Sequence, residues 1–183
     1  MPPPPEEQPS SLFDGPADDV SDPRELLLGY LDWYREALLR KIDGLSDAQL
    51  RTPAGPLGWS PLGLVKHLGW VERRWMQWGF NAADVVPWLP GADQAAGERA
   101  EYNVTAGEPT ADVIAAYLRE VQRTRELCAP AALADASKLG GRFPAPGPGP
   151  SLGRILFHLL QEYARHVGQL DIARELIDGS TGE

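Results

Sequence analysis

Two histidines and one glutamate recur at four-residue intervals near the end of the chain, at His158, Glu162 and His166. Residues four apart on an α-helix lie about 40° apart around the axis and about 6 Å apart along it, so their side chains converge. Glu162 can therefore share one cation with either neighbouring histidine. The remaining histidine of the chain, His67, is the natural further ligand.

Two neutral imidazoles and one carboxylate suit a borderline divalent ion such as zinc, nickel, iron or cobalt. A closed structural zinc site usually has four protein ligands, so three predict an open, catalytic site. Cys128 is the sole cysteine, which excludes a thiolate cluster within one chain. His158 and His166 are about 12 Å apart along a straight helix and cannot bind the same ion. Spacing alone leaves open which of them pairs with Glu162, and an ordinary surface pairing explains the same pattern.

Four long amphipathic helices are predicted to position these residues. Apolar residues recur with helical spacing over residues 22–43, 60–79, 110–128 and 151–176. Ser21 or Asp22, Ser60, Thr110 and Ser151 stand where side chains cap helix N-termini, and Ser46 and Gln49 have the spacing of a capping box. These elements predict an all-α, four-helix bundle.

The connections between the helices differ in length and composition. Residues 80–109 form a long connection, with a helical turn expected around 93–102, and this length favours an up-down-down-up topology. Residues 129–150 are rich in proline and glycine, so this loop is placed to line a site. Residues 1–21 predict a disordered, proline-rich acidic tail, which leaves one domain over residues 22–179.

The net charge of −9 opposes binding to nucleic acid and to anionic membranes, which favours a small-molecule substrate. No run of about 18 apolar residues suggests a membrane span, and the N-terminus lacks the pattern of a secretory signal. We therefore expect a cytoplasmic protein. A homodimer is slightly favoured over a monomer.

Two segments resemble the DinB superfamily of four-helix bundles. They are Trp59-Ser-Pro-Leu through Lys66-His67-Leu68, and Glu162-Tyr-Ala-Arg-His166-Val-Gly-Gln-Leu-Asp171 with Arg174 to Gly179. Within about residues 22–179, the chain is most similar to the branch related to mycothiol-dependent maleylpyruvate isomerase and to small bacterial proteins without assigned activity.

The resemblance implies a divalent metal, with zinc favoured over nickel, held by His67, Glu162 and His166. Many superfamily members have histidine at the Glu162 position, whereas the isomerase-like branch has a carboxylate. His158 then lies outside the ligand set, where it contacts substrate, orients Glu162 or packs. The implied activity is that of a thiol-dependent, mycothiol-like S-transferase or isomerase acting on a small electrophile. A metal-dependent hydrolase and a non-catalytic metal-binding or ligand-binding stress protein are the alternatives.

Arginines near these histidines are candidates for recognising an anionic group. Arg142 lies in the proline-rich and glycine-rich loop, and Arg73 and Arg74 follow His67. Arg165 points roughly 100° away from His166 on the helix and is a poor candidate. Cys128 is interpreted as a small buried hydrophobe rather than a nucleophile.

Overall fold

The computed structural model describes residues 15–85 and 101–181, and its regular elements are helices. The long ones are α1 (Pro23–Ile42), α3 (Pro61–Glu72), α4 (Thr110–Cys128) and α5 (Leu152–Asp178). Two short ones, α2 (Asp47–Arg51) and the single turn η1 (Gly55–Leu57), connect α1 to α3, and a π-helix, η2 (Arg73–Phe80), extends α3. The predicted all-α bundle is confirmed.

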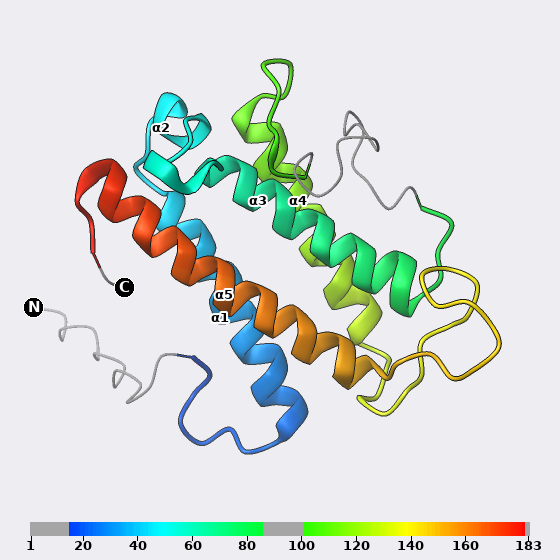
Figure 1. Cartoon of the computed structure of the whole chain (residues 1–183). Coiled ribbons are helices and arrows are strands. Elements are labelled where there is room, and N and C mark those ends of the chain that lie inside the picture. Colours follow the sequence, from blue (N-terminus) through cyan, green and yellow to red (C-terminus); the bar gives the residue numbers. More distant parts are fainter. Residues whose placement is uncertain (1–14, 86–100, 182–183) are drawn as a thin grey trace, which may run out of the picture.

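The helices pack in two pairs, α1 against α5 and α3 against α4, and α3 also contacts α5. Figure 1 shows that α1 and α5 run in one direction and that α3 and α4 run in the other. This is the up-down-down-up order. Because α3 and α4 are parallel, the chain between them must return along the bundle, and this explains the length of that connection.

Side-chain caps begin most helices where the sequence predicts them. Asp22 accepts hydrogen bonds at the start of α1, Ser60 at the start of α3 and Ser151 at the start of α5. The capping box that starts α2 is also present. The prediction for Thr110 was wrong, because Pro109 occupies the cap position and Thr110 is the first helical residue. The Thr110 hydroxyl instead bonds with Asp47 and Arg51, which ties α4 to α2.

The second predicted helix changes its hydrogen-bond pattern partway along. From Arg73 to Phe80 it is a π-helix, and the N–H of Asn81 still donates to the carbonyl of Met76, five residues back. A π turn shifts the register of every later side chain relative to an α-helix, and such segments are frequent at functional sites.

Several sequence predictions fall on residues outside the described ranges. These include residues 1–14 of the predicted tail and most of the predicted turn at 93–102. Residues 15–21 are described, and Pro16 lies so close to Gly29 of α1 that a side chain at Gly29 would collide with it. Within the described residues, no helix has the length and apolar character needed to cross a membrane.

Candidate metal centre

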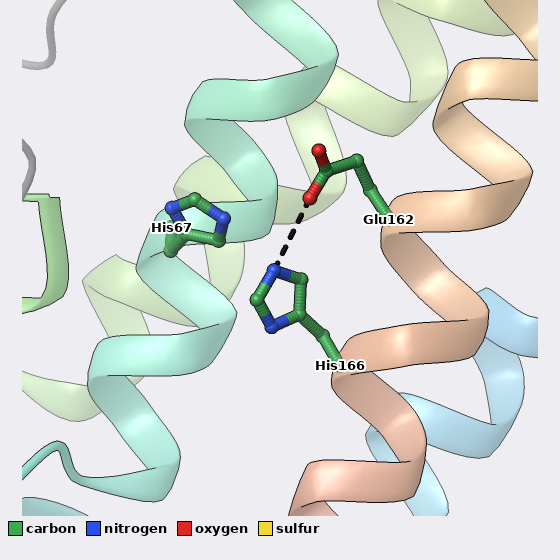
Figure 2. Close-up of side chains that lie close together, drawn as sticks. All are labelled: His67, Glu162 and His166. Carbon is green, nitrogen blue, oxygen red and sulfur yellow. Dashed lines mark hydrogen bonds and ion pairs between the residues drawn. The ribbon is translucent and has the colours of Figure 1, made fainter.

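Three side chains that are distant in sequence converge between α3 and α5. Figure 2 shows His67 on α3 facing Glu162 and His166 on α5. One ligand atom from each residue lies within 4.8 Å of the other two. Both histidines are buried and Glu162 is half-buried. The group can therefore surround a single cation.

The hydrogen bonding of His67 leaves one ring nitrogen available. Its Nδ1 lies 2.9 Å from Oε2 of Glu101, and because a carboxylate only accepts, Nδ1 carries the proton. Nε2 is buried and has no hydrogen-bond partner among the described residues. Burial lowers the pKa of His67 despite the opposing effect of Glu101, which favours the neutral imidazole that binds metals.

His166 presents the same nitrogen to the same space. Its Nδ1 lies 2.8 Å from the amide oxygen of Gln169, so this nitrogen donates, while Nε2 lies 3.2 Å from Oε2 of Glu162. In the neutral ring, Nε2 and the carboxylate oxygen turn lone pairs toward one another, and a shared cation stabilises that arrangement. Without a cation, a proton on Nε2 donates to the carboxylate instead, and this hydrogen bond lowers the pKa of Glu162 against the effect of burial. The carboxylate is therefore charged at neutral pH.

No pattern in the sequence indicated Glu101, which lies in the aperiodic connection before α4. Its buried carboxylate is held by Arg74 and by His67, 34 residues away in the chain. Gly63 permits this arrangement, because a side chain there would collide with the carbonyl of Tyr102. The Tyr102 ring then stacks on His67 with centroids 4.3 Å apart.

Unlike Glu101, Gln169 could have been predicted as a partner of His166 from its position in the sequence. It stands three residues after His166, and residues at this spacing on a helix are neighbours. Carboxylates, carbonyls or waters that hold the second nitrogen of a metal-binding histidine fix its tautomer and ring orientation. Glu101 and Gln169 are therefore in the positions where such partners are expected.

His158 and Arg142 lie outside the three-residue cluster, and both contact Trp75. His158 Nε2 lies 3.3 Å from Oε1 of Glu162, the oxygen that is not in contact with His166. Its ring also lies against Trp75, with centroids 4.1 Å apart. Arg142 stacks over the same indole at 4.3 Å from the ring centroid. Both residues therefore border the centre without joining it.

A cavity of about 710 Å³ opens beside the cluster. Its lining is mixed, with charged groups from Arg74, Glu101 and Arg165 next to the rings of Trp59 and Tyr102. Arg165, which the helix turns away from His166, is exposed and also contributes to the lining of this cavity. A polar ligand of moderate size fits this space.

Cys128 lies in the apolar core, as the sequence indicated, and burial raises the pKa of its thiol to about 11. A thiol with this pKa is almost entirely protonated at neutral pH, so it is a poor nucleophile and a poor ligand. Any sulfur chemistry at the centre must use a thiol that comes from outside the chain.

Residues 26–179 match the model of the family described as mycothiol-S-transferase. The chain belongs to the mycothiol-S-transferase family. This family is part of the DinB-like superfamily of mycothiol-dependent enzymes, so the resemblance inferred from the sequence is confirmed. The match extends from α1 to the end of α5 and contains all three residues of the cluster. A comparison with curated proteins found no match.

Proposed function

We propose that the protein joins the sulfur of mycothiol to a small electrophile, with a divalent metal held by His67, Glu162 and His166. The observation that carries this proposal is the buried Nε2 of His67, which lacks a hydrogen-bond partner among the described residues and faces the other two ligand atoms. Burying a polar nitrogen without a partner costs free energy, so such an atom indicates a ligand.

The donor set fits zinc best and nickel next, since two imidazoles and one carboxylate suit borderline ions and leave positions open for other ligands. An ion at this position lowers the pKa of a thiol that binds it. The chain's own residues do the positioning. Glu101 and Gln169 hold the two imidazole rings, and the polar cavity admits the thiol.

The proposed transfer balances without any redox partner. The thiol gives its proton to solvent, its sulfur forms a bond to the electrophilic carbon, and the leaving group departs with the bonding electron pair. The transfer needs no cysteine of the chain, whose only thiol is buried in the core. Its role is to bind both reactants and to keep the histidine nitrogens unprotonated and aligned.

Metal analysis of protein purified without chelators tests the ligand set. We expect about one zinc or nickel ion per chain in the wild type and in His158→Ala, a histidine variant that keeps the three proposed ligands. We expect substoichiometric metal in His166→Ala. A wild type that holds no metal and takes none up during zinc or nickel titration would refute the proposal.

Turnover is tested with mycothiol and chlorodinitrobenzene, by following thioether formation in the wild type and in His67→Ala. Equal rates would exclude the cluster from catalysis. Stoichiometric metal without thioether formation would support a binding protein instead, and loss of chloride in the absence of any thiol would support a hydrolase. Each result therefore selects one of the functions left open by the sequence.

A further inference from the structure

A second cavity, of about 570 Å³, lies beside His158, which is part of its wall. The contact between His158 and Glu162 links this cavity to the first one, which Glu162 lines. The other walls come mainly from the apolar residues Trp75, Phe143, Pro150, Ile155 and Phe157, together with the polar residues Arg154 and Gln161. The lining thus differs from that of the polar cavity that holds the proposed ligands.

The walls of this second cavity expose flat aromatic surface. The side chain of Phe157, on the same helix as Glu162, is 63% exposed. Trp75 packs beside Phe143 with ring centroids 6.3 Å apart, and beside His158. Large apolar side chains that remain open to water around a hollow favour a ligand that covers them, and aromatic walls favour planar ligands through stacking.

Arg142 lies next to this cavity, because it stacks on Trp75, which is part of the wall. Its guanidinium stacks on Trp75 and Trp78, and within the described part of the chain its side chain makes no hydrogen bond or ion pair. Its backbone N–H donates to the carbonyl of Trp78, and Gly141 approaches that carbonyl more closely than a residue with a side chain could. The loop therefore holds Arg142 in place, with its donors open to a ligand.

The charges around Arg142 favour an anion. Its pKa is lowered by burial and by the nearby positive charge of Arg74, with Glu101 opposing both. Arg74 is already paired with Glu101, so Arg142 is the cation that lacks a carboxylate partner among the described residues, and an anionic group bound to it would offset the repulsion from Arg74. The guanidinium fork also matches the two oxygens of a carboxylate.

We propose that the aromatic cavity binds the acceptor substrate and that this acceptor is a planar aromatic electrophile whose anionic group pairs with Arg142. The inference rests on the proposed transfer function. It assigns the two reactants to two spaces, with the thiol in the polar cavity beside His67 and the acceptor in the aromatic one beside His158. The two spaces adjoin at the contact between Glu162, which lines the first, and His158, which lines the second.

The test measures binding of two unreactive probes, toluate and its neutral isostere toluamide, to the full-length protein by isothermal titration calorimetry. We expect toluate to bind the wild type about ten- to a hundredfold more tightly than toluamide, as for a charge-assisted hydrogen-bonded pair. Arg142→Gln should abolish that preference, and Arg142→Lys should restore part of it, because lysine keeps the charge without the planar fork.

Phe157→Ala should lower the binding affinity for both probes severalfold, because it removes stacking surface without removing charge. Matched controls are Arg123→Gln on α4 and Ile172→Ala on α5, an apolar residue that is 53% exposed. Both controls should bind like the wild type. Circular dichroism and thermal melting of each variant distinguish a lost contact from a lost fold.

Repeating the titrations after chelator treatment distinguishes binding in the cavity from binding to a metal. The inference is overturned if toluate binding disappears with the metal while Arg142→Gln leaves it unchanged, or if Phe157→Ala and Ile172→Ala behave alike. Neither probe needs a thiol or a turnover. A negative binding result therefore does not contradict the proposed transferase activity. Likewise, a lack of mycothiol transfer does not change how the probes bind.

Discussion

The contact region between α3 and α5 contains two buried polar clusters with opposite properties. In the first, Glu72 accepts hydrogen bonds from Arg35 at 2.6 and 2.9 Å, from Tyr163 at 2.8 Å and from Thr124 at 2.6 Å. Both of its carboxylate oxygens therefore have partners. In the second cluster, His67 keeps a buried nitrogen without a hydrogen-bond partner among the described residues.

The difference separates a structural cluster from a functional one. A fully hydrogen-bonded buried ion pair fixes how the helices pack and leaves nothing for a ligand to bind. A buried cluster with an unpaired nitrogen costs stability until a ligand arrives. The two clusters should therefore respond in opposite ways to mutation, the first through folding and the second through binding.

Glu72→Ala should have the largest effect on folding. It leaves the guanidinium of Arg35 buried without its main counter-charge, which destabilises a protein by about 3–5 kcal/mol. Chemical denaturation measures the free energy of unfolding. The double variant Arg35→Leu/Glu72→Leu should recover most of the loss, because it removes both charges. If the free energy of unfolding of Glu72→Ala equals that of the wild type, the first cluster does not stabilise the fold.

His67→Leu should reverse that pattern. We expect the affinity for zinc to fall by more than about 100-fold, since a proposed ligand is lost and even indirect partners of ligands are worth 10–100-fold. The metal-free protein should keep or increase its free energy of unfolding, because leucine removes an unpaired buried nitrogen. Competition titration and denaturation measure the two quantities. A large loss of metal-free stability would show that His67 is part of the structural framework instead.

Glu101→Ala should lower the affinity for zinc by about 10–100-fold, because His67 loses the carboxylate that fixes its tautomer. The control is Glu120→Ala, which removes a half-buried glutamate that is likewise paired with an arginine of η2. The control should bind zinc like the wild type. Equal losses of zinc affinity in the two variants would indicate that removing any negative charge near η2 weakens zinc binding.

Cys128→Ala should have the smallest effect, leaving zinc affinity and mycothiol transfer unchanged. Burial raises the pKa of this thiol to about 11, so the reactive thiolate becomes abundant only as the pH rises toward that value. At pH 8 only about one thiol in a thousand is ionised. Iodoacetamide labelling at that pH should therefore be far slower in the folded chain than in the denatured chain. Rapid labelling of the folded chain would contradict this prediction.

Local features of the fold could be predicted because they depend on neighbours in sequence. The serine caps before α3 and α5 were confirmed, because a cap needs only a side chain and the next few backbone N–H groups. The convergence of Glu162 and His166 likewise follows from helical geometry alone. Thr110 does not cap α4, because Pro109 takes the cap position and the Thr110 hydroxyl bonds instead with two distant residues, Asp47 and Arg51.

The sequence by itself determined the helices and their bundle, and its resemblance to a family selected the three residues that the structure brings together. Only the tertiary structure decided which groups hold those residues and what surrounds them. Glu101 meets His67 across 34 residues, and Arg142 reaches Trp75 from a loop far along the chain. Contacts of this kind depend on how helices and loops pack, through close approaches such as those at Gly63 and Gly141, and no periodic pattern encodes them.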